Sequence, residues 1–365
     1  MTLSLPSTRE EAWRWSDLSG LEALSVAPAT GATSGLDSHW IGAGPRLLFV
    51  DGIYDDARSD PGPVAVGLTG ARSYHPLGRL ATAPGWTLSL GKDAATPPGP
   101  IEIVHVATGG ASHVPARIVL AEDAQASIVE TYVGDGWANR LTGIELGRSA
   151  RLMRAIRLIQ DSGFVSLRDE AVVGTGASLV TTILAAGEAG SRLDAAITLD
   201  GPGAFAEHGG ALLARGSQRH DAAVVIRHAR EEGTSRQFWR AVADDHATAS
   251  MAARVEVARD AQKTDGEQSL RGLMLRRTAT INLKPELEIF ADDVKCAHGA
   301  TVGELDAQAL FYMTSRGITP DRARALLTQA FIADAISRIG EDAVRDAFQA
   351  EAERRLEAGG SETWG

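Results

Sequence analysis

The sequence of 365 residues predicts a mainly β protein whose strands stack as repeated coils. Between Ile101 and about Val302, short apolar runs with β-branched or aliphatic alternation are separated by small residues. A Gly or Asp followed by Ala recurs there, with the alanines at positions 126, 150, 177 and 204. Aromatic residues make up only 5% of the chain, which suits narrow stacked backbones better than a wide sandwich core. A loose period in the twenties, without amphipathic helices between the strands, is typical of a β-helix.

The same strand pattern also fits a doubly wound α/β fold, because strand assignments from one sequence are weak. Neither Gly-x-Gly-x-x-Gly nor Gly-x-x-x-x-Gly-Lys-Ser/Thr occurs in the chain. The pattern alone leaves both folds open, and no nucleotide is expected to bind to this chain.

The region of residues 1-100 reads as an N-terminal helical and mixed segment. Ser7-Thr-Arg-Glu10 is a capping-box pattern that predicts a short helix through Trp15. Trp13 and Trp15 are expected to pack this helix onto the main body. Short apolar runs then alternate with Gly and Pro clusters up to Pro100, which predicts short strands and loops.

Residues 101-303 form the predicted β-helix core, and residues 304-365 a C-terminal helical domain. One helix is expected over 306–315 before Gly317, and Thr319-Pro320 caps a second, with Pro at its first helical position. Gly340 ends the second helix, and a third is expected over 341–356. These helices are expected to cap the last coil, to bind a partner, or to do both.

Composition narrows the classes of partner and compartment. A formal net charge of -11 argues against nucleic acid and against an anionic membrane, because both need a basic footprint. The N-terminus lacks a basic region followed by an apolar run, and no stretch of 18 consecutive apolar residues occurs. A single cysteine rules out an internal disulfide and fits a reducing compartment, so we expect a cytoplasmic location.

The candidate site residues are Cys296, the only cysteine, and His298. In an extended segment residues two apart point to the same face, so the thiol and the imidazole are expected side by side. Both are ligands for iron, copper or zinc. Two ligands do not complete a tetrahedral site, so the others would come from solvent, from distant side chains or from another polypeptide. As bare residues, a buried free cysteine and a hydrogen-bonded core histidine explain the pair equally well.

No catalytic residues are expected. The chain has no Gly-x-Ser-x-Gly elbow, and Asp292 and Asp293, being adjacent, face opposite ways in a strand and are read as coil-edge or interface charges. The other histidines show no tight ligand spacing, although stacked coils can align distant residues. They are His39, His75, His105, His113, His208, His220, His228 and His246.

Several stretches together resemble the SufB/SufD family of iron-sulfur cluster assembly proteins, and its SufD branch in particular. They are Ala291 to Gly303, Leu310 to Ile318, Ala261 to Leu270, Lys284 to Ile289 and, near the start, Glu11 to Leu18. Long matches in a fixed order are more specific than a short motif. The resemblance implies a right-handed parallel β-helix flanked by helical ends.

The resemblance also implies a function, that of a non-enzymatic scaffold subunit of the SufBCD complex. SufB would pair with the last β-helix coils, and the SufC ATPase would dock on the C-terminal helices. His298, and with it Cys296, would lie at the SufB interface, where the nascent iron-sulfur cluster or its iron is shared. A homodimer through the same exposed coil is plausible for the isolated chain.

Two alternatives stay open. SufB proteins have more cysteines and a Cys-x-x-x-His arrangement followed by Glu-His-Glu-Ala-Thr, whereas this chain reads Cys296-Ala-His298-Gly-Ala-Thr, which favours SufD over a SufB-like direct scaffold. A β-helix enzyme acting on polysaccharide would line a groove with carboxylates and aromatics, and aromatics are few in the repeat region.

Overall fold

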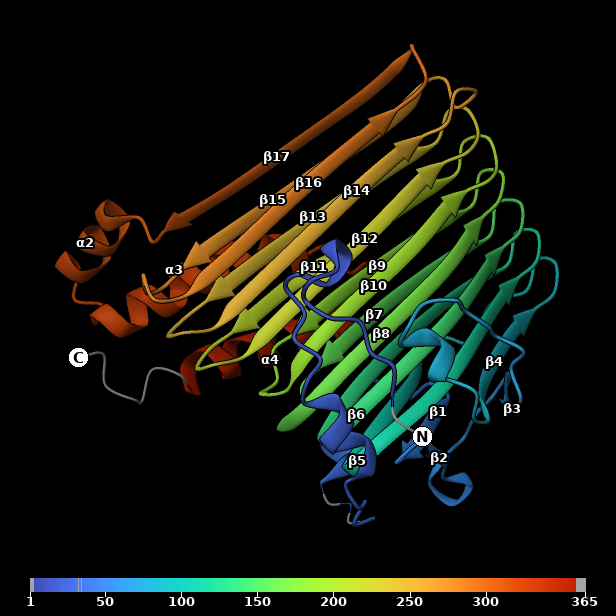
Figure 1. The fold of residues 1–365 in the computed structure, drawn as a ribbon, viewed down its shortest axis with the longest axis horizontal. Coiled ribbons are helices and arrows are strands. Elements are labelled where there is room, and N and C mark those ends of the chain that lie inside the picture. The colour runs from blue at the N-terminus through green and yellow to red at the C-terminus, as the bar shows by residue number, and fades with distance from the viewer. Residues whose placement is uncertain (1–2, 32, 34, 359–365) are drawn as a thin grey trace.

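The computed structural model, which describes residues 3–31, 33 and 35–358, shows a parallel β-solenoid (Figure 1). In that part of the chain 17 strands form one continuous hydrogen-bonded network. From β7 onward each strand pairs in parallel with the strand two places later, so successive strands alternate between two faces. One turn runs from Arg151 to its register partner Ser178. A later turn, from Ala249 to its partner Ile281, is longer, so the repeat is not strict.

The two faces enclose the main hydrophobic core. Face A consists of β4 (Gly85–Leu90), the second halves of β5 (Ile101–Leu120) and β6 (Gln125–Leu146), β8 (Ser162–Val173), β10 (Gly190–Leu199), β12 (Arg219–His228), β14 (Thr248–Val257) and β16 (Thr280–Ile289). Face B consists of β1 (Arg46–Val50), the first halves of β5 and β6, β7 (Arg151–Leu158), β9 (Ser178–Ala185), β11 (Phe205–Ala214), β13 (Thr234–Ala243), β15 (Thr264–Met274) and β17 (Val294–Glu304).

A repeated tight turn explains the small-residue period. The backbone N–H groups of Ala150, Ala177 and Ala204 each donate to the carbonyl three residues earlier, at 3.1–3.2 Å, and Ala124 does the same. The residue before each of these alanines has a positive φ of 54–67°, which Gly, Asp and Ser supply here. The repeat position before Ala150 is therefore Ala124, and not Ala126 as the sequence period indicated, and the same turn already occurs at Ala94, which follows Asp93 with a φ of 57°.

The N-terminal segment differs from its prediction. A single 3₁₀ turn, Glu11–Trp13, replaces the expected helix through Trp15, although the backbone N–H of Ser7 does donate to Glu10 as a capping box requires. A separate helix, α1 (Leu21–Val26), follows. The solenoid also begins earlier than residue 101, because β1 and β4 pair in parallel with β5, while β2 (Ile53–Tyr54) and β3 (Val64–Gly67) pair antiparallel with β1 and β4.

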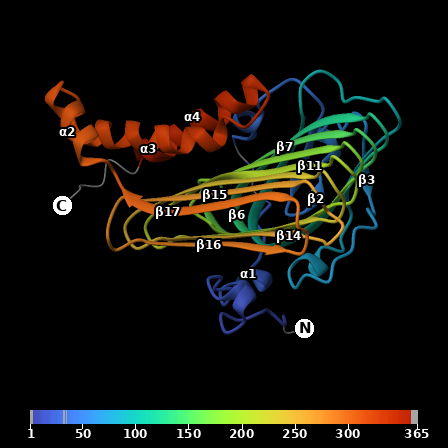
Figure 2. The same ribbon diagram turned by 90° about the horizontal axis from the view of Figure 1, so that it is seen from above.

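Three C-terminal helices follow the last strand, and their capping agrees with the sequence. They are α2 (Ala307–Ser315), α3 (Pro320–Ile336) and α4 (Asp342–Ala358). The Asp306 carboxylate caps α2, and Thr319 caps α3. Apolar side chains of α3 and α4, such as Ile332 and Phe348, pack against the outer side of face B. Helix α1 lies on the opposite side of the solenoid (Figure 2).

The predicted mainly β parallel β-helix with a C-terminal helical region is confirmed. No helix of the described residues lies between successive strands from β4 to β17, which excludes the doubly wound alternative. The helices cover the flank of face B, and the last coil stays uncovered by them.

Candidate functional site at the terminal turn

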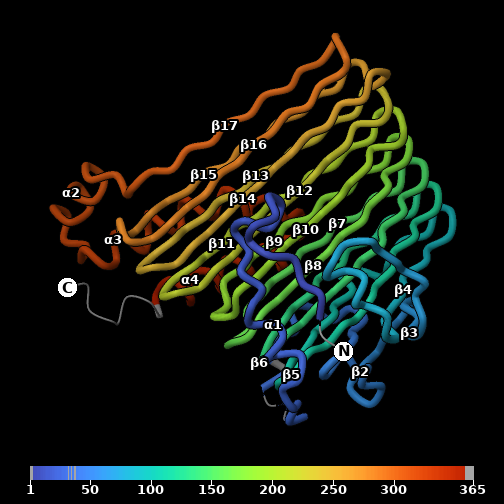
Figure 3. The backbone as a smooth tube through the Cα atoms, viewed as in Figure 1, coloured from blue at the N-terminus to red at the C-terminus, as the bar shows by residue number. Residues whose placement is uncertain are grey.

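The solenoid ends in a turn made of β16 and β17, which pair only inward, with β14 and β15 (Figure 3). Among the described strands, β16 is in register with β14 alone and β17 with β15 alone. Most of β17 is exposed, from Ala297 to Glu304. An uncovered pair of strand edges presents unpaired backbone groups and is a template for further strand pairing.

Cys296 and His298 both lie on β17, and both point to the interior side. Cys296 packs with Val255 and Val257, which belong to the opposite face, so the thiol is half-buried. His298 is exposed, since no further turn covers it. The strand thus places the two potential ligands on one side at the open end, as their spacing predicts.

The thiol of Cys296 is not activated within this chain. Burial raises its pKa above the usual value, and the nearby Asp265 adds to that rise. No hydrogen bond joins Cys296 to His298 among the described residues. This arrangement does not make the pair a nucleophile and base, which require hydrogen-bonding contact.

The ligand set is incomplete in this chain. Among the described residues no group of three or more His, Cys, Asp or Glu side chains is placed to hold a metal ion. The thiol and imidazole fit iron or an iron-sulfur cargo in type, but they would supply two ligands at most.

Three of the other histidines are core residues. His220 hydrogen-bonds Ser191, and His228 hydrogen-bonds Ser235, each at 2.8 Å. Burial lowers the pKa of His208, His220 and His228 to about 4. These neutral, enclosed side chains do not line up as a second metal site.

Asp292 and Asp293 lie in the bend between β16 and β17, and both are exposed. The backbone N–H of Asp293 donates to the side chain of Gln262 at 2.9 Å. Their position at the edge of the coil agrees with the prediction.

A buried ionic cluster that the sequence did not predict fills the interior of the first turns. The Arg154 guanidinium donates to Asp169 at 2.6 Å and to Glu130 at 2.7 Å. Although burial opposes it, the charges of these two carboxylates raise the pKa of Arg154. Arg140 contacts His105 nearby, and burial holds the pKa of that histidine well below its usual value.

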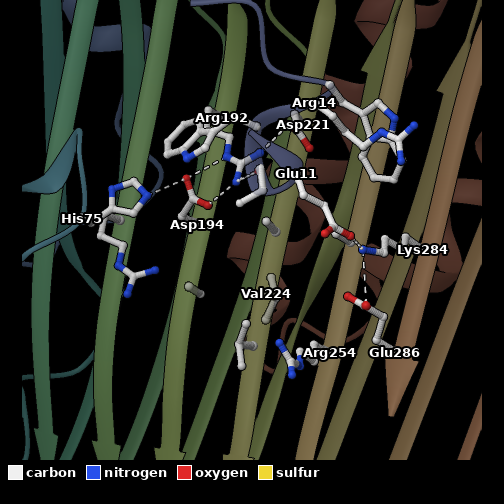
Figure 4. Close-up of a pocket in the computed structure, with 18 of the residues that line it drawn as sticks. Glu11, Arg14, His75, Arg192, Asp194, Asp221, Val224, Arg254, Lys284 and Glu286 are labelled. Carbon is white, nitrogen blue, oxygen red and sulfur yellow. Dashed lines mark hydrogen bonds and ion pairs between the residues drawn. The ribbon is translucent and has the colours of Figure 1, made fainter. Parts of the chain in front are cut away.

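A groove of about 500 Å³ lies between the N-terminal segment and the outer side of face A (Figure 4). Arg192 pairs with Asp194 at 2.6 Å and with Asp221, and its guanidinium stacks 4.5 Å from the ring of Trp13. Burial opposes ionisation of Asp194, yet Arg192 and His75 together lower its pKa to about 2. Trp13 thus packs onto the main body as predicted.

On the other side of the groove Lys284 of β16 pairs with Glu11 at 2.8 Å and with Glu286 at 3.3 Å (Figure 4). Every carboxylate named here already has a cationic partner. The arrangement therefore anchors the N-terminal segment to face A, from the middle turns to the terminal one.

The fold and this site define a parallel β-solenoid protein with one uncovered end that carries a half-buried thiol and an exposed imidazole on one strand. Residues 104–331, more than half of the chain, match the family model described as SUF system FeS cluster assembly, SufBD core domain. The chain therefore belongs to the SufB/SufD family of the SUF iron-sulfur cluster assembly system.

Curated relatives agree with this assignment. The iron-sulfur cluster assembly protein SufD of Escherichia coli is 26% identical over 382 residues, which cover 97% of this chain and 90% of the relative. An iron-sulfur cluster assembly SufBD family protein of Synechocystis is 25% identical, covering 93% of this chain and 84% of the relative. SufD of Bacillus subtilis is 28% identical over 158 residues, covering 43% of this chain and 36% of the relative. None of the helices in the described residues is long and apolar enough to cross a lipid bilayer.

Proposed function

We propose that this chain is a SufD-type scaffold subunit that pairs with SufB through its terminal turn. The observation that carries the proposal is the uncovered end itself, where β16 and β17 have free edges and His298 is exposed. A second solenoid docked on those edges would continue the sheets and supply the missing ligands. His298 and Cys296 would then contribute to the nascent cluster at the shared interface.

The second part of the proposal places the SufC ATPase on the C-terminal helices. Helix α2 buries none of its residues, and Phe311 and Tyr312 on it are 75% and 60% exposed. Two neighbouring exposed aromatics on one short helix are typical of a protein-binding surface. Since this chain has no phosphate-binding motif, ATP would bind to SufC alone, and its hydrolysis would move the two scaffold subunits relative to each other.

In this proposal the chain has no catalytic activity of its own and works in the cytoplasm. The raised pKa of Cys296 supports a ligand that is deprotonated only when metal binds, rather than a standing nucleophile.

Co-purification with SufB and SufC tests the proposal, with His298→Ala and Cys296→Ala compared to the parent. We expect His298→Ala to preserve the complex and to lose most of its iron and sulfide, because the histidine is exposed and supports no packing. His246→Ala is the matched control, since His246 is an exposed histidine in the turn between β13 and β14. A full iron content in the His298→Ala complex would refute the metal role of His298. If the parent chain forms no complex with SufB, the scaffold role is refuted.

A further inference from the structure

A column of polar side chains runs along the interior of face B and ends at His298. Thr181 pairs in register with His208, Gln237 with Gln268, and Gln268 with His298. Strands β11 and β13 link these pairs. Glu207 is in register with Arg236, so the residues that follow them, His208 and Gln237, occupy neighbouring positions on the two strands. The first four members are almost fully buried, whereas His298 is exposed at the open end.

The orientation of the Gln268 amide is determined by its contact across the core. Its Nε2 donates to the backbone carbonyl of Glu286 on β16 at 3.4 Å. Because a carbonyl can only accept, the amide cannot be reversed without losing this bond. Oε1 is therefore the free end, and it is buried without a hydrogen-bonding partner among the described residues.

His298 is the neighbour that can use this free acceptor. The two residues are register partners on adjacent parallel strands, which lie about 4.8 Å apart, and their side chains share the interior side. A glutamine side chain is long enough to bring Oε1 within the roughly 2.9 Å of an N–H···O bond to the imidazole. The imidazole of His298 has no hydrogen bond in the part of the chain that the structure describes.

We infer that Gln268 is a positioning residue for His298: its Oε1 accepts the imidazole N–H and leaves the other ring nitrogen bare. Since Oε1 can only accept, it selects the tautomer whose N–H faces it. The remaining nitrogen then points toward the open end with its lone pair free for a metal. This inference rests on the proposed role of His298 as a ligand.

Partners of this kind matter for metal binding. A hydrogen bond to the second ring nitrogen fixes the orientation and the tautomer of a ligating histidine, and its loss typically costs about 10-fold to 100-fold in metal affinity. Gln237 offers a matched comparison within the same column. Its Nε2 likewise donates to a carbonyl of the opposite face, that of Arg254 at 3.1 Å, and its Oε1 is likewise unpartnered among the described residues, but it lies one strand further from His298.

The test is the tautomer of His298 in the full-length, metal-free chain, read from long-range ¹H–¹⁵N spectra of ¹⁵N-histidine-labelled protein at a pH where the ring is neutral. The His298 signals are assigned by their disappearance in His298→Ala. We expect one tautomer in the parent, a mixture of both in Gln268→Leu, and a single tautomer again in Gln268→Glu, whose carboxylate also accepts. Gln237→Leu should leave the His298 signals unchanged.

An unchanged tautomer in Gln268→Leu overturns the inference, and so does an equal effect of Gln237→Leu, which would indicate a general disturbance of the core. If Gln268→Leu does not fold, Gln268→Met of similar length replaces it under the same criteria. The iron content of the complex with SufB and SufC is the second readout, and we expect about a 10-fold loss for Gln268→Leu. Failure of the proposed function is seen separately, as iron retained in His298→Ala, whereas the tautomer experiment needs no metal.

Discussion

The two ends of the solenoid are built differently. At the N-terminal end β1 and β4 pair with β5, antiparallel strands cover their outer edges, and the interior holds the paired charges of Glu130, Arg154 and Asp169. At the other end β16 and β17 have no described strand beyond them, and their side chains are half-buried or exposed. Unpaired strand edges invite association with other chains. In this chain they are covered at the N-terminal end and are left free only at the terminal turn of β16 and β17. We infer that stability comes from the closed body and partner binding from the open turn.

Among the substitutions that compare the two ends, Arg154→Ala is expected to lower the free energy of unfolding most. Its removal leaves Asp169 buried without a cation and Glu130 with only the more distant Arg140, at 4.0 Å, and it opens a cavity, so the free energy of unfolding should fall by about 5 kcal/mol. Urea unfolding followed by circular dichroism measures the loss. His298→Ala is the control at the open end, and a surface change of this kind should alter stability by less than about 0.5 kcal/mol. Equal losses for the two variants would contradict the division between a closed body and an open end.

The second largest effect is expected from acid, which should lower the free energy of unfolding through the buried histidines of the closed body. Burial holds the folded-state pKa of His208, His220 and His228 at about 4, below the 6.5 of the free side chain. Between pH 6.5 and 4 the unfolded chain therefore binds protons at these histidines that the folded chain does not bind. Their contribution to the free energy of unfolding is fully present above pH 6.5 and is lost as the pH falls from 6.5 toward 4. At pH 5.5 each histidine should cost about 1.4 kcal/mol relative to pH 7.5.

Urea midpoints at pH 7.5 and pH 5.5 measure this dependence. His228→Asn, which cannot be protonated, should reduce the difference between the two midpoints by at most about a quarter, because burial also lowers the pKa of His105 and adds a fourth contribution. His246→Ala, an exposed site, should leave the difference intact. A midpoint that does not move between the two pH values would show that these rings are not held neutral by the fold.

The C-terminal helices allow a comparison within one region. Phe348 of α4 is completely buried against face B, so Phe348→Ala should lower the free energy of unfolding by about 3 kcal/mol. Phe311 of α2 is 75% exposed, and Phe311→Ala should leave stability within about 0.5 kcal/mol of the parent. Urea unfolding gives both values, and a pull-down with SufC should show weakened binding for Phe311→Ala only. Unchanged SufC binding in that variant would move the docking surface away from α2.

Features that depend on local chemistry were predictable from the sequence. The pair Cys296 and His298 shares a side because a strand has a period of two, and Asp306 and Thr319 cap their helices because capping needs only the next few residues. The small-residue period indicated stacked coils but left the doubly wound fold open, and the family resemblance favoured the β-helix. The structure places the repeat at Ala124 instead of Ala126.

Features that depend on register between turns were not predictable. Gln268 and His298 lie one turn apart, but the late turns of the solenoid are longer than the early ones, so no fixed step along the sequence identifies such partners. The segment before Trp15 had the local signals of a helix. Burial of Trp13 against Arg192 is a tertiary contact, and such contacts override local propensity.

The smallest effect on stability, and the sharpest test of the open end, is expected from Ala300→Lys. Ala300 is exposed on β17, two residues beyond His298 and on the same side. In the isolated chain the lysine ammonium reaches water, so the free energy of unfolding should change by less than about 0.5 kcal/mol. A solenoid docked on β16 and β17 would have to bury that charge without a partner, which costs several kcal/mol, so complex formation with SufB should fall by at least about 100-fold. Size-exclusion chromatography of the mixed subunits measures the loss, and Thr301→Lys, whose side chain points outward on the same strand, is the control. If both lysine variants pair with SufB as the parent does, the terminal turn is not the surface that SufB covers.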